Sequence, residues 1–492
     1  PPLPHHLLFK INSLIHFNKI SLAAVTPKLV HLLTTLQPDR SIYALNQLHK
    51  SPTTCYDPLS FIESLGSNLK PAAKQPTGMM CHRAIITPAK IYLMGPEIET
   101  SNFVVAHFAA HADDFIRVTF VDENWSKLPP DTISFTTREG LLYKTLKTQI
   151  HDRILSILRN GIVIGRKNYE FLAFSASQLR SRSLWMFASN DHVRAEDIRR
   201  WMGCFTSIRS VSKCAARMGQ LFSSSRQTVH VKERDVEHIP DVECTRDGVT
   251  YCFSDGVGKI SRFFAQQVAG HCGLTSVPSV FQIRYGGYKG VVAVDRNSFR
   301  KLSLRPSMLK FSSDNRMLNV TSWSKPMPCF LNREIVTLLT TLGVEDRAFE
   351  TLLRDQLELM NKMVDDATAA IAVLKNLVSS SDSDMLVKMM NHGYEPRGEP
   401  YLSMMLSSCY EILYADLRGK CKVLVPKGRV LMGCLDEVGN LEYGQVFVKI
   451  TKRAGCGTED ETETLRGKVA VTRNPCLHPG DIRVVEAVYD AV

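Results

Sequence analysis

Two basic side chains flank a glycine turn and are the residues of this sequence best suited to chemistry. In residues 281–295, FQIRYGGYKGVVAVD, Arg284 precedes the pair Gly286-Gly287 and Lys289 follows it. Gly-Gly suits the positive φ angles of a two-residue hairpin loop, and backbone without side chains leaves room for a phosphate group beside the cations. The pattern therefore favours phosphate binding. An ordinary hairpin with two solvated charges is the other interpretation, and these residues alone do not decide between them.

Two strands are needed to hold this turn in place. Phe281, Ile283 and Tyr285 alternate with polar residues, which is the period-two pattern of a half-buried strand. After the turn, residues 291–294 are apolar without a break, and such a run predicts a strand covered on both faces. The residues therefore predict a hairpin of two mostly apolar strands, interrupted by its two cations.

The positive charge of the chain is concentrated in one segment. The chain has a net charge of +11, and residues 141–235 hold 17 Lys and Arg against 7 Asp and Glu. Basic surface with interleaved aromatic residues indicates nucleic-acid binding. Because many of these aromatics stand in runs as apolar as buried strands, a solvated face above an aromatic core remains the alternative. The aromatic residues are Tyr169, Phe171, Phe174, Trp185, Phe187, Trp201 and Phe205.

Length and composition bound the class of protein. A chain of 492 residues, 44% of them hydrophobic, is long enough for about three domains with real cores. It has no apolar run of the roughly 18–20 residues that cross a membrane. The 13 cysteines include no CxxC pair, which argues against a zinc ribbon or a disulfide framework and predicts buried thiols in a reducing compartment. Because the chain starts at Pro1 without a methionine and stops at Val492 inside a strand-like stretch, we expect it to be an internal piece of a longer protein.

The apolar periodicity predicts alternating helical and strand-rich blocks. A second helix is expected after Thr26-Pro27, and Asp191 is a candidate helix cap. The two later strand-rich blocks are candidates for two copies of one barrel. The predicted order is helical at 7–37, strand-rich at 80–190, helical at 191–222, strand-rich at 251–311, helical at 345–378, a serine-rich break at 379–383, helical at 386–390 and 402–413, and strands again from Cys421.

A series of longer motifs carries a family resemblance. The motifs are SDGVGKIS (254–261), QIRYGGYKGVVAVD (282–295), LSLRPSMLKF (302–311), PCFLNREI (328–335), GEPYLSMML (398–406), GRVLMGCLDEVGNLEYGQVFVKI (428–450) and VTRNPCLHPGDIRVVEAV (471–488), with FLAFSASQLRSRSLWMF (171–187) and SKCAARMGQLFS (212–223) upstream. In order and spacing they resemble the eukaryotic RNA-dependent RNA polymerases of RNA silencing, most closely the type-2 paralogue of plants. The match covers most of the chain from about residue 80.

The resemblance implies an α+β fold built around two double-psi β-barrels. A helical connector would join the barrels, and a mixed α/β region would precede them. The implied domains are a helical N-terminal segment at 1–79, a basic RNA-binding α/β region at 80–244, the first barrel at 245–330, the connector at 331–418, and the start of the second, catalytic barrel at 419–492, which would be incomplete.

The resemblance also implies site residues. Lys289, Lys310 and Arg473 take catalytic positions, because a lysine there neutralises triphosphate or leaving-group charge and Arg473 lies on the strand that meets the incoming nucleotide. Asp255 and Gly256 fit a structural turn as well as a site, and His478 fits a hydrogen-bonded turn as well as a contact with nucleic acid. The residues implied to bind nucleotide or RNA are Arg284, Lys259, Asn474 and His478.

The catalytic metal is not accounted for by this chain. In the family a DxDGD motif of the second barrel holds Mg²⁺, and the resemblance places that motif beyond Val492; residues 1–492 contain none. Nucleotidyl transfer with two metal ions needs such carboxylates, so we expect this chain to bind RNA or nucleotide but not to polymerise by itself. No residue of the chain is predicted as a metal ligand. The aspartate pairs that we interpret as solvated are Asp113-Asp114, Asp365-Asp366 and Asp382/Asp384.

Two functions of different class remain open. The first is an RNA-directed RNA polymerase that converts single-stranded RNA into double-stranded RNA for small-interfering-RNA production. The second is a non-catalytic RNA-binding protein derived from it, and a third, weaker option is an unrelated phosphate-binding barrel. The resemblance implies single-stranded RNA and nucleoside triphosphates as ligands, a template-supplying polymerase and a dicer-type nuclease as partners, no membrane, and a nuclear location.

Overall fold

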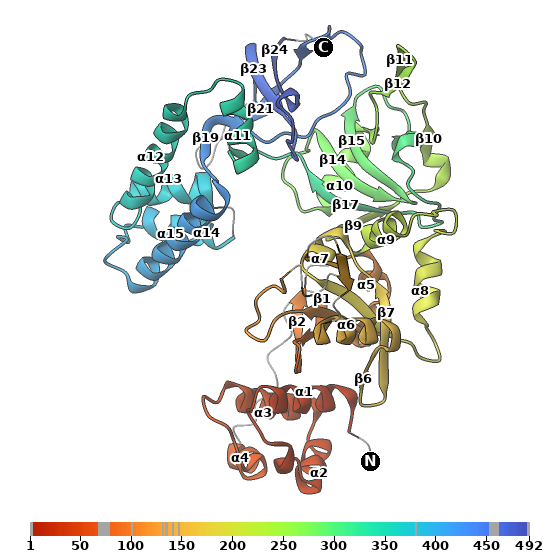
Figure 1. The fold of residues 1–492 in the computed structure, drawn as a ribbon, viewed down its shortest axis with the longest axis vertical. Coiled ribbons are helices and arrows are strands. Elements are labelled where there is room, and N and C mark those ends of the chain that lie inside the picture. The colour runs from red at the N-terminus through yellow and green to blue at the C-terminus, as the bar shows by residue number, and fades with distance from the viewer. Residues whose placement is uncertain are drawn as a thin grey trace. The chain divides into compact units, whose positions relative to one another are not determined.

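The computed structural model describes residues 3–66, 79–99, 102–129, 132, 136–139, 142–145, 148–378, 381–451 and 462–489. The chain divides into two compact units, Pro1–Trp323 and Ser324–Val492 (Figure 1). Each unit has hydrophobic clusters of its own. The mixed helix and strand content is as predicted. No helix in the described ranges combines the length and hydrophobicity needed to cross a membrane.

The first unit begins with four short helices around a common core. Leu14, Leu29 and Leu45 are fully buried there. The helix predicted after Thr26-Pro27 is confirmed, since the Thr26 hydroxyl accepts a hydrogen bond from the Leu29 amide and Pro27 is the first helical residue. The helices are α1 (His5–His16), α2 (Pro27–Thr35), α3 (Pro38–Lys50) and α4 (Pro58–Leu65), with the 3₁₀ turn η1 (Leu22–Ala24).

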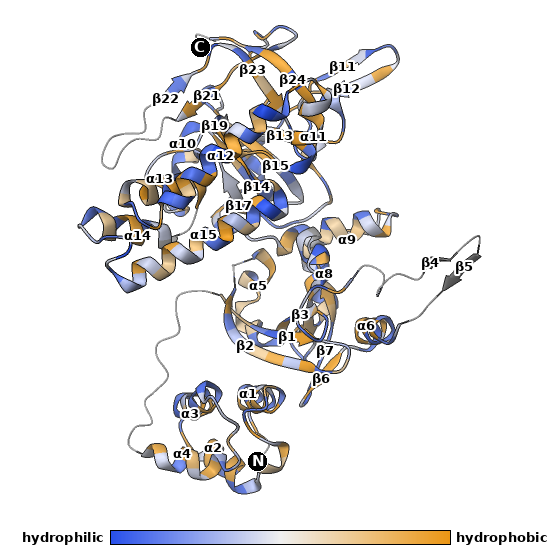
Figure 2. Cartoon of the chain, turned by 60° about the vertical axis from the view of Figure 1, so that its left-hand side comes forward, coloured by the Kyte–Doolittle hydropathy of each residue, from blue (hydrophilic) through white to orange (hydrophobic). Residues whose placement is uncertain are grey.

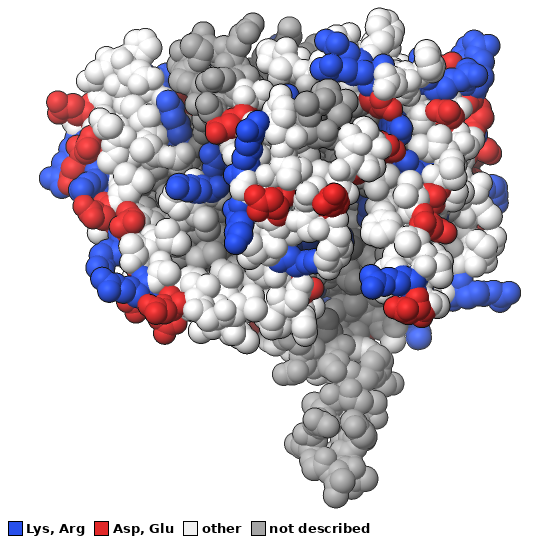
Figure 3. All heavy atoms as spheres, turned by 90° about the horizontal axis from the view of Figure 1, so that it is seen from above, with Lys and Arg blue, Asp and Glu red and all other residues white. Residues whose placement is uncertain are grey.

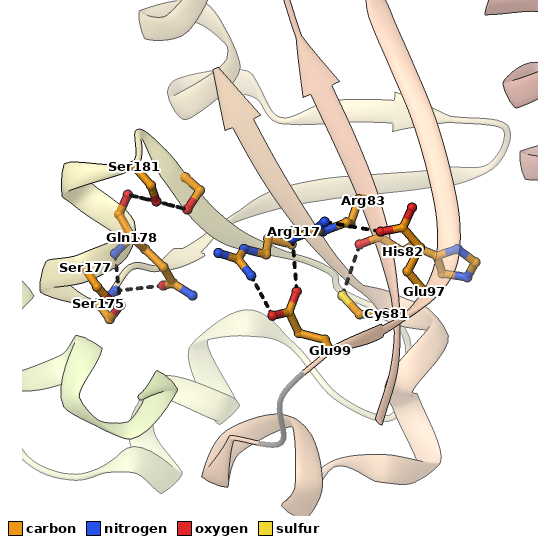
Figure 4. A network of polar contacts seen from close by, with 11 residues as sticks. Cys81, His82, Arg83, Glu97, Glu99, Arg117, Ser175, Ser177, Gln178 and Ser181 are labelled. Atoms are coloured by element: carbon orange, nitrogen blue, oxygen red, sulfur yellow. Dashed lines mark hydrogen bonds and ion pairs between the residues drawn. The ribbon is translucent and has the colours of Figure 1, made fainter. Parts of the chain in front are cut away.

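A six-stranded mixed sheet follows, in the order β2-β1-β3-β8-β7-β6. Across three of its strands Arg83 bridges Glu97 and Glu99, and Arg117 lies 2.7 Å from Glu99 (Figure 4). These charges therefore balance one another. The strands are β1 (Met79–Ile86), β2 (Ile91–Glu99), β3 (Phe115–Phe120), β6 (Ile162–Ile164), β7 (Lys167–Ala173) and β8 (Ser183–Ala188), and β4 (Thr136–Glu139) pairs with β5 (Leu142–Thr145) outside this sheet.

The aromatic residues of the basic segment belong mainly to the core. Tyr169, Trp185 and Phe187 are buried, so these rings are not platforms for bases, and their charged neighbours form the solvent-facing side. Asp191 is not a cap: α8 starts after Arg194, whose amide donates to Asp197. The helices around the sheet are α5 (Phe103–His107), α6 (Gln149–Asn160), α7 (Ala176–Arg180), α8 (Ala195–Met202) and α9 (Val211–Gly219), with 3₁₀ turns η3 (Ala109–Asp114) and η5 (Gln220–Phe222).

The first unit ends in a seven-stranded sheet of order β10-β16-β13-β15-β14-β17-β9. One helix, α10 (Arg262–His271), packs on it through Phe264, Ala265 and Val268, all fully buried. The strands are β9 (Arg226–His230), β10 (Val236–His238), β13 (Val257–Ser261), β14 (Val280–Tyr285), β15 (Tyr288–Asp295), β16 (Leu302–Leu304) and β17 (Met317–Trp323), with 3₁₀ turns η6 (Glu233–Asp235) and η7 (Pro306–Met308) and the separate hairpin β11 (Glu243–Arg246)–β12 (Val249–Cys252).

The second unit consists largely of helices packed on one another. Helices α12 and α15 carry hydrophilic and hydrophobic residues along their length (Figure 2), and Met360 and Leu406 are among the residues that they bury in the shared core. The helix predicted over 345–378 is two helices, because Asp366 caps a new one through the Thr368 amide. The helices are α11 (Arg333–Thr341), α12 (Asp346–Lys362), α13 (Ala367–Leu377), α14 (Ser381–Asn391) and α15 (Pro400–Lys420).

The aspartate pairs do not all lie where we expected. Asp382 and Asp384 lie on α14 and not in a loop, since that helix already begins at Ser381; the side chain of Asp382 lies outside those described. Asp114 is not solvated, because its side chain is 15% exposed and lies 2.6 Å from Lys167 Nζ. Asp113 is 80% exposed, as the solvated interpretation predicts, although His82 Nε2 lies 3.4 Å from it. Asp365 pairs with Arg397.

Short strands complete the second unit. The sheet β20-β24-β23 is exposed over much of its surface, and Val471 and Val484 are 44% and 69% exposed. The strands are β18 (Pro328–Phe330), β19 (Leu424–Arg429), β20 (Gln445–Val446), β21 (Lys449–Thr451), β22 (Thr462–Thr464), β23 (Gly467–Thr472) and β24 (Ile482–Ala487), with the 3₁₀ turn η8 (Pro479–Asp481).

Candidate active site

The glycine turn joins two strands in the way the sequence predicts. Strands β14 and β15 pair antiparallel, with Tyr285 opposite Tyr288 as the last pair before the loop. Gly286 and Gly287 have φ angles of 51° and 86°, which is the left-handed conformation that a two-residue hairpin of this kind requires. The predicted hairpin is therefore confirmed. The expected cover on both faces of β15 is wrong, because only Val292 of residues 291–294 is buried and the face that carries Lys289 is partly open.

Close packing of the turn brings a second lysine next to it. A Cβ atom at Gly287 would lie 1.8 Å from the Phe311 carbonyl oxygen, so only glycine lets the two segments approach. The Lys310 amide donates a 3.0 Å hydrogen bond to the Gly287 carbonyl oxygen. Lys289 and Lys310, 21 positions apart in sequence, are thereby held at one place.

Four cationic residues meet at this place, and we call them the cationic cluster: Arg284, Lys289, Lys310 and Arg217. Arg284 and Lys289 are direct cross-strand neighbours and share a face, and Arg217 comes from α9. Burial, followed by the positive charges of Arg284, Arg217 and Lys310, lowers the pKa of Lys289. Burial lowers the pKa of Arg284 to about 10. The surroundings of both groups therefore oppose their positive charge.

Little negative charge balances this cluster. In the part of the chain that the structure describes, its one ion pair joins Lys310 Nζ to Asp255, at 3.9 Å, and the side chain of Asp255 is 73% exposed. Lys310 Nζ also donates to the Ser307 carbonyl oxygen. Cations that are close together and partly buried repel one another, and a bound anion with several oxygens relieves this repulsion. The arrangement is suited to a phosphate or triphosphate group.

Arg284 has a polar neighbour that sequence reasoning missed. Asn319 on β17 is its cross-strand partner and is 1% exposed. Arg284 Nε and Asn319 Oδ1 are buried without a hydrogen-bond partner in the described chain, and both residues line one small pocket of about 20 Å³. That is enough room for one bridging water molecule. No sequence signal links the two residues, because strand register alone makes them neighbours.

Two further residues shape the site. Asp241 accepts hydrogen bonds from the hydroxyls of Ser254, at 2.7 Å, and Ser307, at 2.6 Å, and so ties together the loops that carry Asp255 and Lys310. Gly256, with a φ angle of 77°, belongs to the turn after Ser254, as the structural interpretation of Asp255-Gly256 predicts. Arg217 could have been found, since it lies in the block SKCAARMGQLFS. Asp241 stands in no motif, and no signal points to it.

Lys259 does not join the cationic cluster. Its Nζ lies 3.1 Å from Asp295, and each side chain is about a quarter exposed. Lys259 is level with Ala293 of β15, four residues beyond Lys289, or about 13 Å along the strand. The ion pair with Asp295 gives this lysine a structural role that is sufficient by itself, and its contact with nucleotide stays a prediction.

The other candidate residues lie in the second unit. Arg473 and Asn474 follow β23, which ends at Thr472, so they lie in an exposed turn and not on the strand. His478 heads the turn η8: its Nδ1 accepts the Gly480 amide at 3.0 Å, and its own amide donates to Asp481. His478 is therefore a hydrogen-bonded turn histidine, and its ring stays exposed. Their contacts with nucleotide or RNA stay predictions.

The described residues do not fit a magnesium site. Among them, no group of three or more His, Cys, Asp and Glu side chains is arranged to hold a metal ion. Mg²⁺ prefers oxygen ligands in near-octahedral geometry, whereas the candidate site is lined by cations.

Comparison with known proteins identifies the family. Residues 86–492 match the family model described as RNA dependent RNA polymerase, and residues 2–75 match the model described as RNA dependent RNA polymerase, helical domain. Among solved structures, the chain is similar to RNA dependent RNA polymerase QDE-1 from Thielavia terrestris, with a TM-score of 0.65 and 16% identity over 99% of this chain and 57% of that one. This likeness to a solved structure concerns the fold alone.

Curated relatives agree with the family models. The chain is 54% identical to RNA-dependent RNA polymerase 2 of Arabidopsis thaliana, over 99% of this chain and 45% of that protein. It is 52% identical to probable RNA-dependent RNA polymerase 2 of Oryza sativa subsp. japonica, again over 99% and 45%. The chain thus spans about half the length of the curated relatives that it matches. It belongs to the RNA-dependent RNA polymerase family and is most like the plant type-2 members.

Proposed function

We propose that this chain is part of an RNA-directed RNA polymerase that copies single-stranded RNA into double-stranded RNA for small-interfering-RNA production. Membership of the family supports the reaction class. The observation that carries the proposal to particular residues is the cationic cluster, where Arg284, Lys289 and Lys310 meet with one exposed carboxylate for balance. Nucleoside triphosphates and an RNA template are ligands of the matching charge.

In this proposal the cluster acts on phosphate oxygens. The Arg284 guanidinium binds two oxygens of one phosphate group, while Lys289 and Lys310 supply point charges that neutralise the triphosphate. Negative charge builds up on the leaving pyrophosphate during nucleotidyl transfer, and fixed cations stabilise it. Arg473 and Asn474 contact the incoming nucleotide, and Lys259 and His478 contact RNA.

The same proposal includes the two barrels, the source of the magnesium ligands, and the location and partners of the protein. We take the seven-stranded sheet as the first double-psi β-barrel and the strands after residue 419 as part of a second. Magnesium ligands are supplied by residues that this chain does not contain, and residues 1–492 alone do not polymerise. The protein works in the nucleus with a template-supplying polymerase and a dicer-type nuclease.

A non-catalytic RNA-binding protein is the competing proposal. The same cationic cluster supports it, because RNA phosphates match its charge as well as a triphosphate does. Both proposals predict RNA binding, so they differ only in whether the cationic cluster serves templated synthesis.

A segment exchange tests the proposal directly. Residues 1–492 replace the matching segment of the Arabidopsis relative, and copying of a single-stranded RNA template is measured with Mg²⁺ and labelled nucleotides. We expect synthesis by the exchanged protein, a loss of at least about 100-fold in Lys289→Ala and Lys310→Ala, and near-normal synthesis in Lys232→Ala, an exposed lysine outside the cluster. A silent exchanged protein that folds and binds RNA would favour the binding protein. Synthesis by residues 1–492 alone would refute our account of the metal.

A further inference from the structure

A second group of cations lies at the far end of the strand that begins beside the cationic cluster. Positive and negative side chains are interleaved over the face drawn in Figure 3, so a binding surface has to be identified from individual residues. Exposed Arg262, Arg296 and Arg300 are three such residues. Arg296 follows β15, seven residues beyond Lys289, which is about 23 Å along the strand.

Strand pairing brings these residues together. Ser261, the last residue of β13, pairs with Asp295 of β15 on one side, and its amide donates to the Lys301 carbonyl oxygen on the other side. Arg262 therefore lies between the segments that carry Arg296 and Arg300. All three arginines thus lie on neighbouring segments at one end of the central strands of the seven-stranded sheet.

Two phenylalanines share this surface and are exposed to water. Phe263 is 69% exposed and Phe299 is 102% exposed. Phe263 is fixed in this orientation because the next residue, Phe264, is fully buried under the sheet. We call Arg262, Phe263, Arg296, Phe299 and Arg300 the distal patch.

The loop that carries Phe299 is held by hydrogen bonds. The Asn297 amide donates to Asp295 at 2.8 Å, and the Ser298 hydroxyl donates to the Arg300 carbonyl oxygen at 3.1 Å. Arg300 itself donates to the Arg234 carbonyl oxygen at 2.9 Å. The ring and the charges are therefore presented on an ordered loop, which lowers the entropy cost of binding.

Nearby carboxylates do not neutralise the distal patch. Asp295 is engaged by Lys259 at 3.1 Å, and Asp235 is engaged by Lys301 at 2.9 Å. Within the described ranges, the three arginines of the patch have no carboxylate partner. The patch thus presents three positive charges that no carboxylate of the described residues neutralises, beside two exposed aromatic rings.

We propose that the distal patch binds single-stranded RNA away from the cationic cluster, with Phe263 and Phe299 stacking on unpaired bases and the arginines on the flanking phosphates. Exposed aromatic rings among cations are the combination that binds single strands, whereas paired bases are already stacked and offer duplex RNA no such contact. Only the choice of RNA as the single-stranded ligand of the patch rests on the proposed function.

Binding measurements on residues 1–492 test this inference. Affinity is measured for a 20-nucleotide unstructured RNA and a 20-base-pair duplex over a series of salt concentrations. For Phe263→Ala/Phe299→Ala we expect single-strand binding to weaken by about 30-fold or more, because two stacked bases are lost at ~1–3 kcal/mol each, and duplex binding to stay unchanged. For Arg262→Gln/Arg296→Gln we expect the slope of log K against log salt to fall by about 1.4, or ~0.7 for each charge.

Matched controls separate the patch from general effects. Tyr56→Ala removes another exposed ring, 79% exposed, and Arg246→Gln removes another exposed arginine, 84% exposed. Loss in these controls equal to that in the patch variants would overturn the inference. So would equal loss on single strands and duplex, or a change in sedimentation showing that the patch joins two copies of the chain.

The inference and the proposed function fail in different ways. The phenylalanine variant is also placed in the exchanged protein described above. If templated synthesis is absent while the patch variants still lose single-strand affinity, the proposed function falls and the patch stands. If synthesis is present and single-strand affinity is the same in wild type and variant, the patch falls and the proposed function stands.

Discussion

At the scale of single residues, the cationic cluster is destabilised by its own burial and by repulsion between its charges. Burial lowers the pKa of Arg284 to about 10, and burial together with neighbouring cations lowers that of Lys289. Groups with a strongly perturbed pKa are concentrated at functional sites. Lys259 differs from them, because the Asp295 carboxylate lies 3.1 Å from its Nζ and compensates its charge.

Replacement of Lys289 by methionine should stabilise the protein while abolishing its function. Lys289→Met keeps the length of the side chain and removes the repulsion, so we expect the free energy of unfolding at pH 7 to rise by about 0.5–1 kcal/mol, after allowance for screening by solvent. Denaturant unfolding checks the stability, and the exchanged protein checks the loss of synthesis. Lys232→Met, at an exposed position, should do neither.

The same variant should change the pH dependence of stability. Because the pKa of Lys289 is lower in the folded than in the unfolded protein, the unfolded chain binds the proton more tightly. The free energy of unfolding of the wild type should therefore rise as pH increases through the lowered pKa towards 10.5. Lys289→Met should lack this rise, and an unchanged profile would contradict the assignment.

At the scale of elements, the hairpin of β14 and β15 depends on one close approach. Gly287 has a φ angle of 86°, and the Phe311 backbone leaves no room for a Cβ at this position. This contact positions Lys310, so the turn connects backbone conformation to the charge arrangement of the site.

Alanine at Gly287 should damage both stability and function. Gly287→Ala introduces a Cβ 1.8 Å from a carbonyl oxygen and a strained φ angle, so we expect a loss of about 2–4 kcal/mol. Gly273→Ala is the matched control, with a φ angle of 69° and no atom within 4 Å of the added Cβ. It should cost only the ~1–2 kcal/mol of backbone strain. Equal losses in the two variants would show that the contact with Phe311 does not matter.

Helix α1 packs on the six-stranded sheet through a histidine that resists protonation. His5 Nε2 lies 2.9 Å from the Tyr169 hydroxyl, and Phe9 packs on His82 with ring centroids 4.4 Å apart. Burial, with the positive charges of Lys167 and His82, lowers the pKa of His5 to about 4.

Mild acid should loosen this contact. The unfolded chain binds the His5 proton from pH 6.5 downward and the folded chain only near pH 4, so the free energy of unfolding should fall between these values, by about 1 kcal/mol after allowance for partial exposure. His5→Gln should remove this part of the acid sensitivity in denaturant unfolding at pH 5 and pH 7.5. The exposed neighbour variant His6→Gln should retain it.

At the scale of the whole molecule, the described residues form two compact units that do not share a hydrophobic cluster: four clusters lie in the first unit and one lies in the second. Phe264 is fully buried in a cluster of the first unit and Leu406 in the cluster of the second. Units with cores of their own can unfold separately.

Core truncations should therefore act on one unit at a time. Calorimetry of the whole chain should show two transitions. Phe264→Ala should lower the transition temperature of the first unit and Leu406→Ala that of the second. Each change should cost its unit the ~2–5 kcal/mol of a large-to-small core substitution. A single transition that both variants lower would contradict the independence of the two units.

The sequence by itself determined the elements and the family. Gly286-Gly287 between alternating strands predicted the hairpin, and Thr26-Pro27 predicted the start of α2, because turn and cap preferences are local properties of the chain. The motif series by itself indicates the RNA-dependent RNA polymerase family, because it depends only on the order and spacing of residues. Local errors came from competing local signals, as at Asp191, where a later residue starts the helix.

Only the tertiary structure decided which charges meet. Lys259 and Lys289 look alike in sequence, yet strand register gives Lys259 a carboxylate at 3.1 Å and places Lys289 among cations. Asn319, Asp241 and Arg217 join the site through pairing and packing between distant segments. Electrostatic energy depends on distances in space, and the order of residues along the chain does not contain these distances.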